Sequence, residues 1–181
     1  MPGVDTSVGA PVVLDGNGLA RLIAGLKTEG YRVLGPRVAD GAVIYDDIDT
    51  MADLPAGWGD EREGGRYRLR RRDDGALFGY TTAPQGWKRF LYPPRQRLFA
   101  ARRTEDGFAL EPPAPEPAPM AFIGVRACEL AAMAVQARVF GDKDFAEPGY
   151  QRRLAAAFVV AVECGEAGGI VSAPPWAPAP R

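Results

Sequence analysis

Two short runs of apolar residues in the last third of the chain, Met120–Val125 and Ala157–Val162, constrain the fold more than any other feature. A continuous apolar run of this length is typical of a strand that is buried on both faces of a parallel sheet. Between the two runs, Cys128–Val139 repeats apolar residues at helical spacing, and Tyr150–Ala156 is expected to form a second short helix. Strand, helix, helix and strand in this order predict a right-handed parallel crossover unit.

The first 110 residues are typical of a helix followed by β-hairpins. Apolar residues recur at helical spacing from Gly18 to Leu26, so this segment is expected to be a helix. Between the later strand-like segments, Met51–Gly65 is expected to be a loop, and Pro84–Tyr92 is expected to hold a helical turn. Three turns that end in glycine predict hairpins. The expected strand pairs are Tyr31–Val38 with Ala42–Tyr45, Arg66–Arg72 with Ala76–Thr82, and Arg97–Arg103 with Phe108–Leu110.

A proline-rich segment, Glu111–Pro119, favours polyproline II and is expected to be a semi-rigid linker. It divides an α+β lobe over residues 1–110 from a βαβ unit over residues 120–169 that carries both cysteines. Residues 170–181 form an aberrant tail of mostly proline and alanine, which can bury little surface and is expected to be disordered. The predicted fold class is therefore mixed α+β, with hairpins and one or two helices in the N-terminal lobe.

Composition and charge exclude several classes of function. The chain has 181 residues and a net charge of -1, which argues against nucleic acid or an anionic membrane as its main partner. Histidine is absent, which excludes hydrolysis by a Ser-His or Cys-His pair. No run approaches the roughly 20 apolar residues of a membrane span, and the N-terminus has no signal pattern. We therefore expect a cytoplasmic protein, and 2 cysteines argue against a secreted disulfide scaffold.

The two cysteines follow the two predicted parallel strands, at the carboxyl ends where ligand sites of such sheets lie. Cys128 lies at the start of a predicted helix, where the helix dipole and nearby Arg126 favour a thiolate. The alternative is that Cys128 is a small buried residue under the turn. Cys164 is followed by glycines, which admit a bulky group or simply form a loop. Two thiolates complete neither a tetrahedral zinc site nor a four-thiolate cluster, so the site takes further ligands or does not exist in this chain.

Three other features have both a functional and a structural interpretation. Four arginines alternate along one strand and either bind phosphate or an acidic partner, or form a solvated edge. The segment around Trp87 interleaves aromatic and cationic residues, which suits a nucleic acid, a flavin or the anchoring of a helix in the core. The acidic pairs lie in turns without the spacing of acid–base catalysis. These residues are Arg66, Arg68, Arg70 and Arg72; Trp87 to Pro94; and Asp46, Asp47, Asp73 and Asp74.

The segment Gly124-Val-Arg-Ala-Cys-Glu-Leu-Ala-Ala132 resembles the Gly-Val-Arg-Pro-Cys-Asp-Leu-Ala-Ala motif of 4Fe–4S ferredoxin-type β subunits. Proteins of this family are found in soluble NiFe hydrogenases (sulfhydrogenases) and in anaerobic sulfite reductase. Tyr45–Ile48, Leu77–Tyr80 and Pro84–Pro94 also look like the N-terminal half of that family. The similarity covers residues 17–169.

The resemblance implies an electron carrier that is not itself catalytic. Such a protein passes electrons through iron–sulfur clusters, between the catalytic subunits of a hydrogenase or sulfite reductase and a flavin-containing reductase subunit. It implies a 4Fe–4S cluster as the cofactor of the intact family. By this resemblance Cys128 and Cys164 are candidate metal ligands, and Arg126 is a candidate cofactor-binding residue.

The tail departs from the family pattern at Ile170. The family continues with Ile-Cys-Phe-Cys-Ala-Ser-Met-Gly-Thr-Gly-Pro and then a ferredoxin module. Codons can be chosen for this family segment such that deleting one T from the second codon shifts the reading frame. The shifted frame then translates as Ile-Val-Ser-Ala-Pro-Pro-Trp-Ala-Pro-Ala-Pro, which is the sequence from Ile170 to Pro180. We therefore interpret the tail as a frameshift product or a sequencing error. Resequencing the locus checks this, because a clean in-frame reading with no ferredoxin codons downstream contradicts it.

These observations predict a truncated iron–sulfur electron-transfer subunit that keeps two of four motif cysteines, lacks its ferredoxin module and holds no stable cluster. The alternative is a non-redox scaffold without a cofactor, which docks a partner through the arginine strand and the Trp87 segment. Iron and sulfide analysis after anaerobic reconstitution separates the two.

Overall fold

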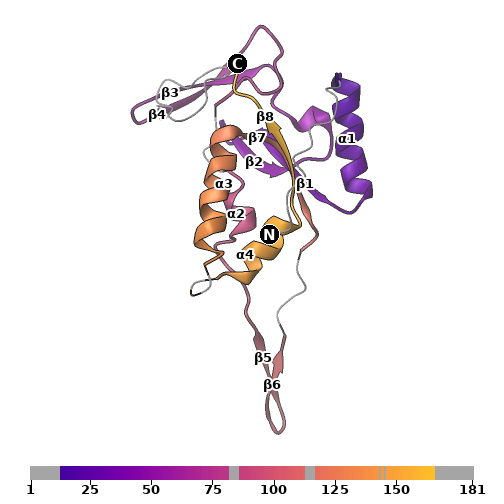
Figure 1. Ribbon diagram of the computed structural model, residues 1–181, viewed down its shortest axis with the longest axis vertical. Helices are drawn as coiled ribbons and strands as arrows, with labels where there is room; N and C mark the ends of the chain where they lie inside the picture. Colours follow the sequence, from indigo (N-terminus) through magenta and orange to yellow (C-terminus); the bar gives the residue numbers. More distant parts are fainter. Residues whose placement is uncertain (1–12, 82–85, 113–116, 143, 145, 166–181) are drawn as a thin grey trace.

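A four-stranded mixed sheet forms the centre of the molecule (Figure 1). The computed structural model describes residues 13–81, 86–112, 117–142, 144 and 146–165. The strand order in the sheet is β2-β1-β7-β8, in which β1 and β2 are antiparallel and the pairs β1–β7 and β7–β8 are parallel. The four strands are β1 (Arg32–Ala39), β2 (Ala42–Asp47), β7 (Met120–Arg126) and β8 (Phe158–Val162).

Helices cover both faces of this sheet, so the fold has three layers (Figure 1). One face carries α1 together with the short 3₁₀ helix η1, and the other face carries α2, α3 and α4. The helices are α1 (Gly16–Thr28), η1 (Met51–Asp53), α2 (Lys88–Leu91), α3 (Ala127–Val139) and α4 (Pro148–Ala155).

The two faces of the sheet bury separate apolar clusters, because successive side chains of a strand point to opposite faces. Leu34 and Phe122 belong to the cluster under α2–α4, while Val33 and Ile123 belong to the cluster under α1. Every residue of β7 is buried, as the apolar run predicts. The same expectation is wrong for β8, because it is the outer strand of the sheet and leaves Phe158 and Ala161 exposed. The cluster under α2–α4 consists of Leu34, Tyr45, Trp87, Leu91, Met120, Phe122, Val125, Met133 and Tyr150. The cluster under α1 consists of Ile23, Leu26, Val33, Ile48, Leu54, Ala121 and Ile123.

A β-bulge interrupts β7 at Gly124. Ile123 pairs with Val160 and Val125 pairs with Ala161, so Gly124 is an extra residue between two consecutive partners. Its φ angle is +82°, in the left-handed region that glycine adopts without a steric penalty. The bulge therefore explains why the motif has a glycine at this position: the backbone here needs a residue without a side chain.

The bulge also changes which face each later residue of β7 meets. Without it, Phe122 and Arg126 would share a face, since they are separated by an even number of residues. With it, Val125 joins Phe122 in the cluster under α2–α4. Arg126 turns to the other side, where its guanidinium meets the backbone of Phe78 and Tyr80. The bulge thus aims Arg126 at the segment that precedes α2.

The mixed α+β class and the parallel crossover are confirmed. The helices expected at residues 18–26, 128–139 and 150–156 are α1, α3 and α4, and β7 pairs in parallel with β8. The pairing of β1 with β7 places strands from both sides of residues 111–119 in one sheet. None of the helices within the described parts of the chain is long and apolar enough to cross a bilayer. The tail over 170–181 lies outside the described residues.

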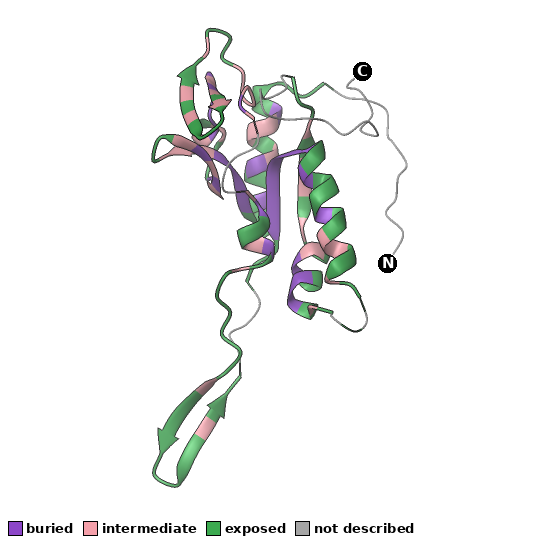
Figure 2. Cartoon of the chain, turned by 90° about the vertical axis from the view of Figure 1, so that its left-hand side faces the viewer, coloured by how far each residue is buried: buried purple, intermediate pink, exposed green. Residues whose placement is uncertain are grey.

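Two of the three predicted hairpins are confirmed. The first joins β1 to β2 through Asp40 and Gly41, with φ angles of 51° and 72°. Two positive φ angles in a two-residue loop are typical of a type I′ turn. The third joins β5 (Ala100–Thr104) to β6 (Gly107–Glu111) and projects from the body as an arm (Figure 2).

The second predicted hairpin is wrong. The arginine-rich strand β4 (Arg66–Arg71) pairs with β3 (Trp58–Glu63), inside the segment expected to be a loop, and residues 76–81 contain no strand. The turn is Gly64-Gly65, and the register sets Glu63 opposite Arg66. Strand β3 has few apolar residues, so its alternation is not visible in hydropathy, whereas opposite charges across the pair favour it.

We expect Gly124→Ala to destabilise the protein by about 2–4 kcal/mol, because it strains the left-handed backbone and overpacks the site. A Cβ atom at this position would lie 2.7 Å from Cε1 of Phe78 and 3.5 Å from Cδ of Pro36. The matched control is Gly25→Ala, which lies in α1 with no atom within 4 Å of the new Cβ. That control should be neutral or stabilising by up to about 1 kcal/mol. Urea unfolding measures both, and equal stability of the two variants would contradict the role of the bulge.

Candidate functional site at the carboxyl ends of the parallel strands

The two cysteines follow neighbouring parallel strands at equivalent positions. Arg126, the last residue of β7, pairs with Val162, the last residue of β8, and each cysteine comes two residues later. Cys128 is in the first turn of α3, and Cys164 lies in the segment after β8. Because the strands are adjacent, both cysteines belong to the same edge of the sheet.

Both cysteines are exposed, and neither forms a disulfide. The expectation that Cys128 is a small buried residue under the turn is therefore wrong. The physical reason is that α3 buries only Glu129 and Met133 of its own length, so the face of α3 that carries Cys128 points away from the sheet. Two exposed soft ligands at one sheet edge can react with thiol reagents or contribute to a metal site.

Arg126 is almost completely buried, with 3% of its surface exposed. A buried cation is costly unless hydrogen bonds compensate for the lost water. Its guanidinium donates to the carbonyl oxygens of Phe78, Tyr80 and Glu163 at 2.6, 2.8 and 2.9 Å, and it lies 5.2 Å from the centroid of the Tyr80 ring. Arg126 therefore connects the segment before α2 to the segment that carries Cys164.

A cleft of about 350 Å³ lies beside this connection. The residues immediately before and after Cys164 line it, so the cleft reaches the edge where the cysteines lie. The hydroxyl of Tyr80 is buried and has no hydrogen-bond partner among the described residues. Burial also raises the pKa of Tyr80 well above its usual value of 10.0, so the phenol stays protonated. The lining residues are Arg72, Asp74, Ala76, Phe78, Gly79, Tyr80, Glu163 and Gly165.

Two carboxylates that sequence reasoning missed hold this region in place. Glu129 is 7% exposed and accepts a hydrogen bond from the backbone N–H of Arg126 at 2.9 Å, which caps α3. Asp60 on β3 accepts hydrogen bonds from the backbone N–H and the hydroxyl of Thr81 at 2.5 and 2.6 Å. An acidic residue three positions into a helix is a capping signal that could have identified Glu129. Asp60 has no comparable local signal, because its partner lies 21 residues away.

The aromatic segment before α2 anchors the core. Trp87 is 4% exposed and Leu91 is fully buried, and both belong to the cluster under α2–α4. The core interpretation of this segment is therefore confirmed, and a buried indole is not available to dock a partner.

The arginine strand is one side of the β3–β4 hairpin. Arg66, Arg68 and Arg70 are exposed on the same face. Glu63 lies opposite Arg66, Glu61 lies opposite Arg68, and Glu61 also forms an ion pair with Arg70 at 3.3 Å. Acidic residues of the neighbouring strand thus offset the positive charge of this face, which favours a solvated edge over a site for phosphate.

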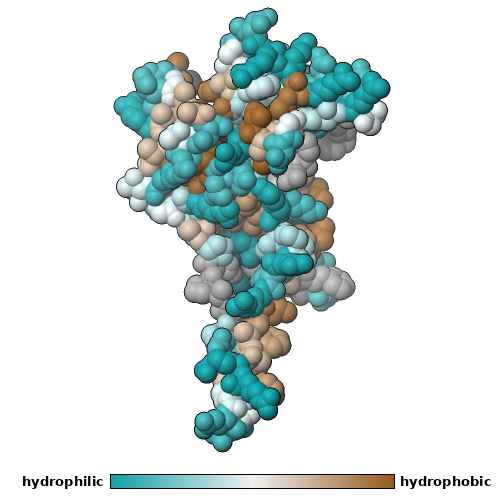
Figure 3. All heavy atoms as spheres, turned by 180° about the vertical axis from the view of Figure 1, so that it is seen from behind, coloured by the Kyte–Doolittle hydropathy of each residue, from teal (hydrophilic) through white to brown (hydrophobic). Residues whose placement is uncertain are grey.

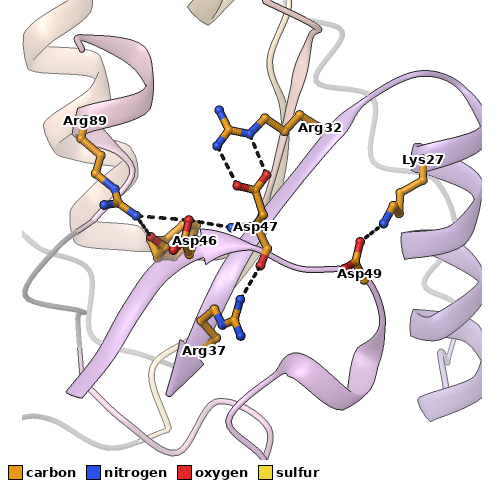
Figure 4. Close-up of polar contacts among 8 residues, drawn as sticks. Lys27, Arg32, Arg37, Asp46, Asp47, Asp49 and Arg89 are labelled. Atoms are coloured by element: carbon orange, nitrogen blue, oxygen red, sulfur yellow. Dashed lines mark hydrogen bonds and ion pairs between the residues drawn. The ribbon is translucent and has the colours of Figure 1, made fainter. Parts of the chain in front are cut away.

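The carboxylates at the end of β2 form ion pairs (Figure 4). Asp47 accepts two hydrogen bonds from Arg32, at 2.6 and 2.7 Å, and this contact holds the pKa of Asp47 below its usual value of 3.8. Asp46 lies 3.4 Å from the guanidinium of Arg89, which also donates to the carbonyl of Tyr45 at 2.7 Å. These contacts connect β1, β2 and α2, so the acidic pair has a structural role. The expectation that this pair lies in a turn is wrong, because Asp46 and Asp47 are the last two residues of β2 and pair with β1.

The donors described at the cysteine edge are too few for a metal site. Within the described ranges, no three histidine, cysteine or acidic side chains come together as metal ligands would. An iron–sulfur cluster of the four-thiolate type needs two more thiolates than Cys128 and Cys164 supply.

No protein-family model, curated protein or solved structure matches this chain. The family membership that the Gly124–Ala132 motif suggests therefore stays a prediction.

Phenylarsine oxide, which bridges two neighbouring thiols, tests whether the cysteines meet. We expect one equivalent to remove both thiols from titration with a chromogenic disulfide (DTNB) in the folded protein. We expect Cys128→Ser and Cys164→Ser each to abolish the stable adduct while leaving one reactive thiol. Arsenic-treated protein that still shows two reactive thiols would place the sulfur atoms too far apart to share a site.

Burial of Glu129 predicts a pH dependence of stability. Desolvation raises the pKa of this carboxyl above its usual value of 4.5, although the hydrogen bond from Arg126 opposes the shift. The folded state therefore holds this proton more tightly than the unfolded state, and the contribution to stability is lost as pH rises through the folded pKa. The Glu129→Gln variant has no titrating carboxyl at this position. Its free energy of unfolding relative to wild type should therefore increase from about pH 4 to pH 7. Urea unfolding at each pH measures this difference. A constant difference between the two proteins would show that Glu129 has the same pKa in the folded and unfolded states.

Proposed function

We propose that this chain is a truncated iron–sulfur electron-transfer subunit of a hydrogenase or sulfite-reductase-like complex, with half of a cluster site. Cys128 and Cys164 would be two of the four thiolates of a 4Fe–4S cluster. The observation that carries the proposal is that both thiols are exposed, two residues beyond the paired ends of neighbouring parallel strands. Its partners would be the catalytic subunits of the complex and a flavin-containing reductase subunit.

The outer face of α3 supports the idea that further protein covers this edge. On the face of α3 that carries Cys128, Val135 and Val139 follow at helical spacing and are 51% and 58% exposed. Solvent-exposed helix faces are normally polar. A ferredoxin-type module packed beside Cys128 would cover this face.

Each remaining residue of the site has a definite part in this proposal. When bound, the cluster would supply one-electron transfer. Arg126 positions the strand end before Cys164 through the carbonyl of Glu163, and Glu129 fixes the first turn of α3 on which Cys128 lies. Arg126 is thus a positioning residue, because its guanidinium contacts carbonyl oxygens on the protein.

Restoring the two missing cysteines tests the proposal directly. The triple variant Val171→Cys, Ser172→Phe, Ala173→Cys introduces the Cys-Phe-Cys segment of the resembled family. After anaerobic reconstitution with iron and sulfide and removal of excess reagent, we expect it to retain close to four iron and four sulfide per chain. The unaltered chain has too few thiolates and should retain less than a quarter of that amount.

Cysteine-to-serine substitutions in the triple variant provide the matched controls. Cys128→Ser and Cys164→Ser should each reduce the retained iron at least fivefold and remove the visible thiolate-to-iron absorption. Far-UV circular dichroism checks that the fold is unchanged. Full iron content in either serine variant would contradict the proposal, as would a triple variant that stays colourless.

A further inference from the structure

The β5–β6 arm projects from the molecule (Figure 2). Large apolar side chains on it are exposed to solvent. Its strands contribute to neither apolar cluster of the body. An isolated two-stranded ribbon is marginally stable in water, and an exposed apolar surface of this kind marks an interaction site. The arm therefore needs an explanation beyond the fold of the body.

One face of the arm carries three large apolar side chains, whereas the other carries charged residues together with exposed Leu98 at its base. The register sets Leu110 opposite Ala101 and Phe108 opposite Arg103, and Phe99 precedes them on the same face by alternation. Phe99, Phe108 and Leu110 are 64%, 74% and 73% exposed. Figure 3 shows apolar residues along one side of the arm and hydrophilic residues along the other.

On the other face of the arm, Arg102 and Glu111 form an ion pair at 3.1 Å.

Charge is also divided along the length of the arm. The tip carries Glu105 and Asp106, and the base carries Arg95 and Arg97; all four are exposed. None of these four forms an ion pair within the described part of the chain. An acidic end and a basic end on one ribbon are complementary to a second ribbon that runs in the opposite direction.

We infer that the arm is a dimerisation element, and that its occupant is the arm of a second copy of this chain. A two-fold axis near Ala101 sets the arms antiparallel with their apolar faces in contact, as an isologous interface requires. Each acidic tip then meets the basic base of the other copy. Arg103 of one arm lies over Phe99 of the other, a cation–π arrangement, and the two Arg103 side chains stay roughly 13 Å apart.

The size of this surface predicts a weak dimer. The exposed fractions of Phe99, Phe108 and Leu110 give roughly 400 Å² per copy, hence roughly 800 Å² for both. With the tip–base contacts and Arg103, the total buried area is about 1,200 Å², the lower limit of specific interfaces. We therefore expect dissociation in the micromolar range.

Sedimentation equilibrium of the full chain from about 1 to 200 μM measures the association. We expect wild type to pass from monomer to dimer over this range. The double variant Phe108→Ser, Leu110→Ser should weaken association at least tenfold, with unchanged thermal unfolding of the body. Val135→Ser, Val139→Ser on the exposed face of α3 is the matched control and should leave the association unchanged.

A charge exchange separates this arrangement from any other dimer. One variant carries Glu105→Lys and Asp106→Lys at the tip, and the other carries Arg95→Glu and Arg97→Glu at the base. Each variant alone places like charges at both ends of the interface and should be monomeric at 200 μM. Their equimolar mixture restores attraction at both ends and should form a heterodimer.

Three results would overturn the inference. Wild type that stays monomeric at 200 μM shows that a second copy is not the occupant. A dimer that the apolar arm substitutions leave intact forms elsewhere on the chain. A mixture of the two charge variants that stays monomeric excludes the antiparallel arrangement.

Discussion

The structure depends on a single extra residue in its most buried strand. Gly124 makes a bulge in β7, and this bulge shifts the alternation of side chains so that Val125 packs under the helices while Arg126 leaves that face. A regular strand would direct a guanidinium into the cluster around Phe122, where apolar side chains offer no hydrogen bonds. The close approach of Phe78 to Gly124 then places carbonyl groups where Arg126 can reach them.

Burial of Arg126 explains why distant segments converge at the site. Tens of residues separate Arg126 from the segment at residues 78–80 and from Glu163, which follows β8. One guanidinium nevertheless binds carbonyls in both places. The acceptors of this guanidinium are backbone carbonyl oxygens, which are neutral. Glu129 and Asp60 support the same region through other hydrogen bonds. Glu129 fixes the start of α3, and Asp60 fixes the segment that ends at Thr81.

The sequence predicted those parts of the fold whose signals are local. Apolar runs identified β7 and β8, helical spacing identified α1 and α3, and Asp40-Gly41 identified the first turn. Strand β3 was missed because charge pairing with β4, rather than burial, stabilises it.

At the site, the sequence placed both cysteines at one sheet edge but could not give the face of α3 that carries Cys128. Whether that side chain is buried depends on how α3 packs on the sheet, which is a tertiary property. The sequence also could not show that Arg126 bonds to carbonyls 37 to 48 residues away.

The cysteine edge is formed without help from a bound group. Small metal domains that fold only with their metal have little core of their own, so the ligands supply the free energy of folding. Here two apolar clusters cover both faces of the sheet, and β7 is buried along its whole length. The hydrogen bonds of Arg126 and Glu129 end on protein atoms and leave both thiols exposed. Loss or gain of a cluster at this edge should therefore change its redox chemistry while the sheet and its helices stay folded.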